Sequence, residues 1–182
     1  MKIIPTKEKY IKTVATEMKK KFGYKSIMAV PQIKKVIVNV GIGKIVKEND
    51  KIEEVVNAIT AITGQKPVKT KAKKAISGFK IREGMEVGVK VTLRGARMWN
   101  FIDRLVSATL PRTRDFQGIN RKAVDQRGSI NIGIKEHTIF PEISPERVKY
   151  IFGMQVTIST NARSQEEGLE LFKLLGFPIK SE

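Results

Sequence analysis

Residues 85–94 read MEVGVKVTLR, and this stretch decides the fold class of the chain. In an extended strand successive side chains point to opposite faces, so the stretch separates into two sets. The apolar set is Val87, Val89, Val91 and Leu93, and the small or polar set is Gly88, Lys90, Thr92 and Arg94. The alternation predicts a strand with one buried face, which is typical of antiparallel sheets.

Other segments carry the same signal and complete a predicted sheet. They are Ile33 to Val40, a short strand around Val68 to Thr70, Ser129 to Lys135 and Met154 to Thr160. Their outward positions hold Lys, Thr, Ser, Asn and Gln, with glycines between them. We expect these side chains to share one face of the sheet.

Four amphipathic segments predict helices at about residues 6–22, 50–63, 97–107 and 164–175. Ile11 is expected on the apolar face of the first of these helices, at residues 6–22. Asp50 with Glu53 and Ser164 with Glu167 have the spacing of capping boxes, in which the first residue is the N-cap. Glycines follow three of these segments, as helix C-termini favour.

This order of elements indicates an α+β fold, mainly an antiparallel sheet with helices packed on one face. The other face is then open. The length of the chain fits a single domain over residues 1–182, with a basic loop at about 71–84.

A formal charge of +17 indicates a polyanionic partner, because such charge destabilises a protein by self-repulsion unless it is neutralised. The residues 65–82, QKPVKTKAKKAISGFKIR, carry seven Lys and Arg residues and no acid. RNA or DNA offers the densest regular array of negative charge. A generic basic protein, or one attracted to anionic lipid, is the alternative.

The open face predicts which form of nucleic acid is bound. Hydroxyl and amide side chains donate to phosphates and 2′-hydroxyls, whereas binding of single strands needs aromatic rings on which bases stack. The face is nearly free of aromatics, so we expect folded, largely double-stranded RNA. For any one strand, an ordinary solvated face explains the same pattern.

The sequence offers no set of catalytic groups, so we expect no enzyme, no cofactor and no metal site. VGIGK at 40–44 fails the phosphate-loop pattern, because Val38 stands where Gly is needed and Ile45 where Ser or Thr is needed. His137 is the single histidine and cysteine is absent, so a zinc site lacks ligands. His137 is expected to be structural. With no long apolar stretch and no signal peptide, we expect a cytosolic protein without membrane partners.

Ordered motifs along the whole chain resemble one family. They include VPQIKKVIVNVGIG at 30–43, TGQKP at 63–67, SGFKIREGM at 77–85, GVKVTLRG at 88–95, LPRTRDF at 110–116, GIKEH at 133–137 and FPEI at 140–143. The chain thereby resembles the bacterial-type large-subunit ribosomal proteins that bind 5S rRNA, the ribosomal protein L5 family. The series covers the chain from end to end, which makes the resemblance specific.

The resemblance implies a structural role in the central protuberance of the large subunit. It implies as partners 5S rRNA, large-subunit rRNA, other proteins of the protuberance, P-site tRNA and a small-subunit head protein across an intersubunit bridge. The matching 5S-facing candidates are Asn39, Gly41, Gly43, Gln65, Lys66, Thr70, Thr92 and Arg94. The candidates in the tRNA-contacting loop are Lys73, Lys74, Ser77, Gly78, Phe79, Lys80 and Arg82.

Several points stay open at this stage. Phe79 either stacks on a base or ribose, or anchors the loop onto its own domain. Glu86, Gln117 and residues 123–128 (AVDQRG) depart from the family pattern, which puts the contacts of the 115–128 segment in doubt. Two functions compete with this interpretation. The chain could bind DNA or RNA without specificity, or it could be a phosphate-handling enzyme that acts near residues 41–44.

Overall fold

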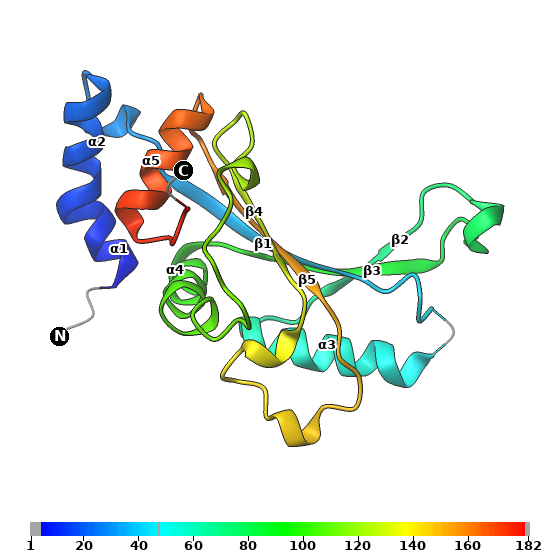
Figure 1. Ribbon diagram of the computed structural model, residues 1–182. Helices are drawn as coiled ribbons and strands as arrows, with labels where there is room; N and C mark the ends of the chain where they lie inside the picture. Colours follow the sequence, from blue (N-terminus) through cyan, green and yellow to red (C-terminus); the bar gives the residue numbers. More distant parts are fainter. Residues whose placement is uncertain (1–4, 47, 181–182) are drawn as a thin grey trace. The chain divides into compact units, whose positions relative to one another are not determined.

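The computed structural model describes residues 5–46 and 48–180, which form two compact units (Figure 1). Unit 1 comprises Met1–Val36, Arg94–Ile132 and Thr157–Glu182, and unit 2 comprises Ile37–Leu93 and Gly133–Val156. Each unit is described by itself. The single domain expected from the length stays a prediction.

Five strands form one antiparallel sheet in the order β2-β3-β1-β5-β4, so the predicted α+β class is confirmed. The strands are β1 (Ile33–Gly41), β2 (Val68–Lys71), β3 (Glu86–Leu93), β4 (Ile130–Ile134) and β5 (Met154–Thr160). They lie within one or two residues of the predicted segments. Among the described residues, no helix combines the length and apolar composition that crossing a bilayer requires.

One continuous helix begins unit 1. It comprises α1 (Thr6–Lys9), a π-helical turn (Tyr10–Val14) and α2 (Ala15–Phe22). The prediction of a helix over residues 6–22 is therefore confirmed. The predicted burial of Ile11 is wrong, because its side chain is 61% exposed. A π-turn closes on a residue one position farther along than an α-turn does, so it shifts which side chains face the core.

Two further helices pack against this one within unit 1. They are α4 (Gly95–Arg104), which continues as a π-helical turn (Leu105–Thr109), and α5 (Gln165–Leu175). α1 contacts α4 and α2 contacts α5. Thr6 N–H donates to Asp103 Oδ1 at 2.8 Å, which ties the start of α1 to α4. Met18, Phe101 and Phe172 are buried and supply much of the core of unit 1.

The capping box predicted at the start of α5 is confirmed with one change. Ser164 Oγ accepts a hydrogen bond from Glu167 N–H at 3.3 Å. Glu167 Oε2 accepts in return from Arg163 N–H at 2.8 Å, one residue before the N-cap. Both bonds satisfy backbone donors that the first helical turn leaves without partners.

α3 (Asn49–Thr63) belongs to unit 2, and its N-cap lies two residues earlier than predicted. The assignment of Asp50 as N-cap is therefore wrong. Glu48 is the N-cap residue, and its carbonyl accepts from Ile52 N–H at 3.2 Å without any side-chain cap. Asp50 lies inside the first turn, where its carboxylate still interacts favourably with the helix dipole.

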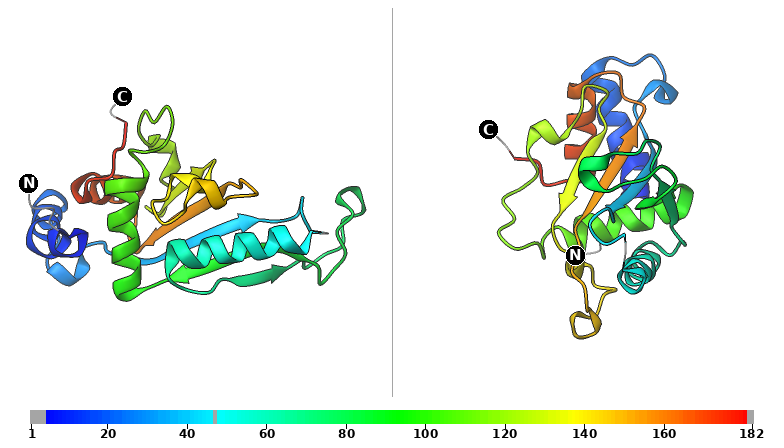
Figure 2. Two further views of the ribbon diagram at one scale, coloured as in Figure 1. Left: turned by 90° about the horizontal axis from the view of Figure 1, so that it is seen from below. Right: turned by 90° about the vertical axis from the view of Figure 1, so that its right-hand side faces the viewer.

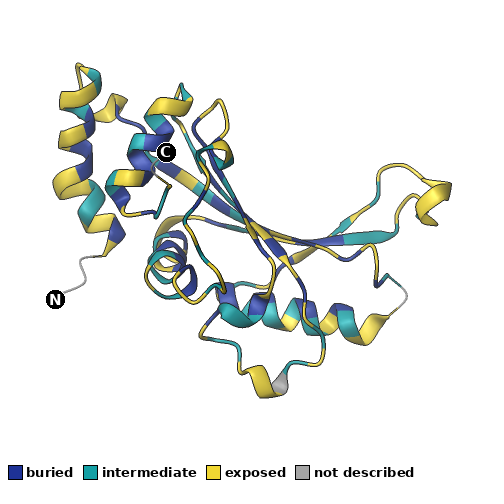
Figure 3. Ribbon diagram, viewed as in Figure 1, coloured by how far each residue is buried: buried dark blue, intermediate teal, exposed yellow. Residues whose placement is uncertain are grey.

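The core of unit 2 lies between α3 and the sheet. α3 contacts β3 and runs along it (Figure 2). The buried side chains alternate along β3, at Val89, Val91 and Leu93, and follow one face of α3, as the colours in Figure 3 show. The predicted inward face of residues 85–94 is confirmed at these three positions.

His137 is a buried structural residue of unit 2. Its side chain is 1% exposed and stacks on the ring of Phe152 at 4.0 Å between centroids. The backbone N–H of His137 donates to Phe152 O at 3.1 Å. Burial lowers the pKa of His137 below its ordinary 6.5, because desolvation disfavours the charged imidazolium.

The lowered pKa of His137 makes stability depend on pH. The unfolded chain binds a proton below pH 6.5, whereas folded His137 resists it, so the contribution is complete above that pH and is lost as pH falls. We expect the free energy of unfolding to fall between about pH 7 and about pH 5.5, with a slope of at most about 1.4 kcal/mol per pH unit from this residue. Denaturant unfolding of the wild type and H137F across this range measures it. Equal pH slopes for the two proteins would contradict the assignment.

Candidate nucleic-acid interface

A row of small and polar residues crosses three neighbouring strands of unit 2. Thr70 in β2 pairs with Gly88 in β3. A Cβ built on Gly88 would lie 2.6 Å from Thr70 Oγ1 and 3.9 Å from Asn39 Oδ1 of β1. The missing side chain of Gly88 therefore leaves room for the hydroxyl of Thr70, with the amide of Asn39 close by on the other flank. Gly88 itself is buried, so the row presents the exposed amide of Asn39 and the half-buried hydroxyl of Thr70.

Gly41 and Gly43 lie beyond Asn39 along the chain and are exposed. Neither has a positive φ, and a Cβ at either would meet nothing within 4 Å. The turn after β1 thus has no conformational or packing need for glycine at these positions. Their backbone is open to close approach from outside, which is what the 5S-facing assignment of both residues requires.

The remaining 5S-facing candidates are distributed around this row. Gln65 follows α3, and its Nε2 donates to Thr92 O at 3.4 Å, which ties it to β3. Lys66 is exposed and Thr92 is half-buried. Arg94 is exposed and belongs to unit 1, where it is the N-cap residue of α4.

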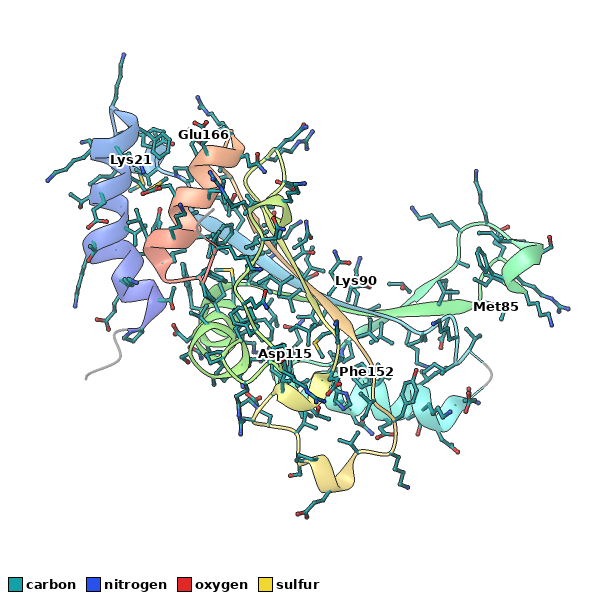
Figure 4. The ribbon with its side chains drawn as sticks, viewed as in Figure 1. Lys21, Met85, Lys90, Asp115, Phe152 and Glu166 are labelled. Atoms are coloured by element: carbon teal, nitrogen blue, oxygen red, sulfur yellow. The ribbon has the colours of Figure 1, made fainter. Side chains whose placement is uncertain are left out.

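Two residues of the same strand face were missed as site candidates. They are Gly88 and Lys90, although the alternation in residues 85–94 had already placed both on the outward side. Lys90 is exposed, pairs with Val68 of β2, and lies on the side of β3 away from α3 in Figure 4. Its ammonium group is suitably placed to bind a phosphate beside the row.

The loop between β2 and β3 is an ordered hairpin tip rather than a loose arm. Ala72 N–H donates to Met85 O at 2.8 Å, and Gly84 N–H donates to Ala72 O at 3.0 Å. Farther out, Ile76 and Ile81 exchange two backbone hydrogen bonds of 2.9 and 3.1 Å. Figure 1 shows this segment extending past the ends of the strands. We call residues 72–85 the hairpin tip.

The apex of the hairpin tip contains a backbone conformation that is unfavourable unless neighbouring bonds stabilise it. Ser77–Phe79 form a single 3₁₀ turn, and Lys80 then takes the left-handed conformation with φ 54°. For a residue with a Cβ this conformation costs about 1–2 kcal/mol. The backbone bonds between Ile76 and Ile81 close the apex on both sides and so compensate for that cost.

All seven tRNA-loop candidates lie in this hairpin tip and are exposed. Phe79 is 76% exposed, so it does not anchor the loop onto its own domain. Lys69, just before the tip, pairs with Glu86 at 2.8 Å. In the part of the chain that the structure describes, no ion pair engages Lys73, Lys74 or Lys80, so their charge is available to a partner.

The atypical 115–128 segment belongs to unit 1 and is held by local hydrogen bonds. Asp125 Oδ1 accepts from the backbone N–H groups of Arg127 and Ser129 at 2.9 and 2.8 Å. The segment ends at Gly128, which has a positive φ of 68°. Residues 123–128 therefore include an ordered turn that exposes Arg127.

Comparison with known proteins bears on the whole chain. A family model described as ribosomal protein L5 matches residues 26–82, and one described as the ribosomal L5P family C-terminus matches residues 86–179. The chain belongs to the ribosomal protein L5 family. The two matches to the L5 family meet near the hairpin tip, between residues 82 and 86.

Individual relatives agree with this membership over nearly their full length. The large ribosomal subunit protein uL5 of Halothermothrix orenii is 51% identical over 172 residues, covering 94% of this chain and 96% of the relative. The uL5 proteins of Fervidobacterium nodosum and Colwellia psychrerythraea are 49% and 48% identical, over 98% and 95% of this chain and 97% and 96% of their own lengths. The resemblance inferred from the ordered motifs is thereby confirmed.

Proposed function

We propose that this chain is a non-catalytic structural constituent of the large ribosomal subunit that binds 5S rRNA and helps attach it in the central protuberance. We further propose that its hairpin tip contacts P-site tRNA and that the protein takes part in a bridge to a small-subunit head protein. Family membership places it on the ribosome, the ribonucleoprotein that carries out translation in the cytoplasm.

The observation that carries the 5S-binding proposal is the row of Asn39, Gly88 and Thr70. An exposed amide and a half-buried hydroxyl on neighbouring strands suit an A-form duplex, whose wide minor groove displays 2′-hydroxyl groups. The free backbone at Gly41 and Gly43 adds a second place of close approach. Lys66 and Lys90 then supply phosphate contacts beside these groups.

The hairpin tip has a different chemistry and therefore a different proposed partner. It combines lysines that form no ion pair with any residue in the described ranges 5–46 and 48–180 with an exposed aromatic ring, whereas the row on the strands has no ring. Lysines attract phosphate from any RNA, and a ring needs a base or ribose that is not already stacked. We accordingly assign the tip to tRNA and the strands to 5S rRNA.

Two matched double variants test this division. N39A/T70A removes the two polar groups of the row and is expected to weaken 5S rRNA binding by about tenfold, since each hydrogen bond contributes about 0.5–1.5 kcal/mol. K74A/K80A is expected to weaken P-site tRNA binding by ribosomes that carry the variant, again by about tenfold, because charge-assisted bonds are stronger. Filter binding of isolated 5S rRNA and tRNA binding to reconstituted ribosomes measure the two effects.

Each double variant serves as the control for the other. N39A/T70A should leave tRNA binding by fully assembled ribosomes unchanged, and K74A/K80A should leave 5S binding largely intact. If both variants weaken both activities equally, the division into two surfaces is wrong. If neither has an effect, RNA binding lies elsewhere on the chain.

A further inference from the structure

The hairpin tip contains more than charge. The tip carries the exposed ring of Phe79 and also a hollow lined by Ala75, Ser77, Lys80, Ile81, Arg82 and Met85. Its walls are therefore apolar carbon and sulfur together with a hydroxyl and two cations. Figure 4 shows Met85 at the base of the tip, on the β3 side.

The hollow and the ring are held in place by backbone bonds. Phe79 N–H donates to Ile76 O at 3.2 Å, and Lys80 N–H donates to Ser77 O at 2.9 Å. Arg82 N–H donates to Met85 Sδ at 3.0 Å, which fixes the far wall. The left-handed residue Lys80 directly follows Phe79, so the turn that exposes the ring is itself part of this bonded frame.

We infer that the hairpin tip binds one unstacked nucleotide of its RNA partner, with the base against Phe79 and the adjoining phosphate at Lys80 and Arg82. This inference rests on the proposed contact with tRNA and specifies the RNA feature that the tip recognises. The ring of Phe79 is 76% exposed, so it contributes little to the packing of the protein itself. A base of a nucleic acid can stack on such a ring.

Charge decides between nucleic acid and an apolar partner for the exposed ring. Lys73, Lys74, Lys80 and Arg82 lie in the same hairpin tip and are exposed, and Glu83 is the single acid between residues 71 and 84. A purely apolar partner would leave these cations desolvated without counter-charges. An intact duplex satisfies the cations but keeps its bases stacked, so the tip selects loops, bulges or elbows in which a base is free.

The experiment separates base from phosphate with two RNA hairpins of equal charge. One carries an unpaired loop, and the other carries the same loop with abasic sugars, so that the phosphates are retained. For the full-length wild-type chain, removal of the bases is expected to reduce affinity by about 5- to 100-fold. For F79A, the two hairpins are expected to bind equally well, and F79W should restore the preference.

Controls identify what a failure means. M28A removes another apolar side chain, 87% exposed and in unit 1, and should keep the full preference for the loop with bases. If K74A/K80A weakens both hairpins while the wild type ignores the bases, the nucleotide site is refuted and the proposed tRNA-facing role stands. If K74A/K80A has no effect on either hairpin or on tRNA, the proposed function of the tip fails, and the nucleotide site fails with it.

Discussion

Replacing Gly168 with alanine is expected to destabilise the protein by about 2 kcal/mol or more, the largest stability effect that we predict for a single methyl group. Gly168 lies in the first turn of α5 and is buried against Gly128. A Cβ at Gly168 would lie 2.4 Å from Gly128 Cα and 2.6 Å from Gly128 O. Both contacts are to backbone, which cannot rotate away as a side chain can.

Two opposing effects set the sign of this change. Alanine is favoured over glycine inside a helix by about 1 kcal/mol, which would stabilise G168A in an exposed helix. Overpacking costs about 1–3 kcal/mol and sometimes more, and because α5 or the turn at Gly128 must move as a whole, we expect about 3 kcal/mol or more here. The steric cost is therefore expected to exceed the gain in helix propensity.

Thermal unfolding measures the outcome. For a chain of this size we expect the midpoint of G168A to fall by about 4–8 °C. G133A is the matched control, because a Cβ at Gly133 meets nothing within 4 Å, and its effect should stay within about 0.5 kcal/mol. A G168A protein as stable as the wild type would show that the two backbones separate easily.

The affinity for 5S rRNA is expected to fall by about a thousandfold between about 50 and about 200 mM salt. The formal charge of +17 and the exposed lysines of the hairpin tip predict roughly six or more phosphate contacts. Each contact releases condensed counterions from the RNA, and added salt reverses that gain. Titration of isolated 5S rRNA with the full-length protein across a salt series measures the slope.

Variants divide this slope into its parts. K90Q removes one exposed cation beside the row and should lower the slope by about one contact. N39A removes a neutral amide, so it should lower the affinity at every salt concentration and keep the slope. A flat salt response, or equal affinity for unrelated duplex RNA, would contradict specific binding of 5S rRNA.

Local pattern was sufficient for two signals that lie within one strand or one helical turn. The alternation in residues 85–94 predicted the buried Val89, Val91 and Leu93, and the Ser164–Glu167 spacing predicted the cap of α5. It failed at Ile11, because a π-helical turn changes the register of side chains without changing the apolar spacing in the sequence. It failed at Asp50 because the sequence does not show whether Glu48 or Asp50 is the residue that precedes the first helical turn.

The sequence by itself determined the α+β class, the basic character of residues 65–82 and membership of the L5 family, since periodicity, charge and ordered motifs are properties of the chain. Only the tertiary structure decided that Gly88 makes room for Thr70 next to Asn39, that a Cβ at Gly168 would meet the backbone of Gly128, and that Phe79 is exposed rather than anchoring the loop. The first two facts depend on distances between residues far apart in sequence, and the third depends on how much of a side chain other residues cover. Neither kind of information is present in local spacing.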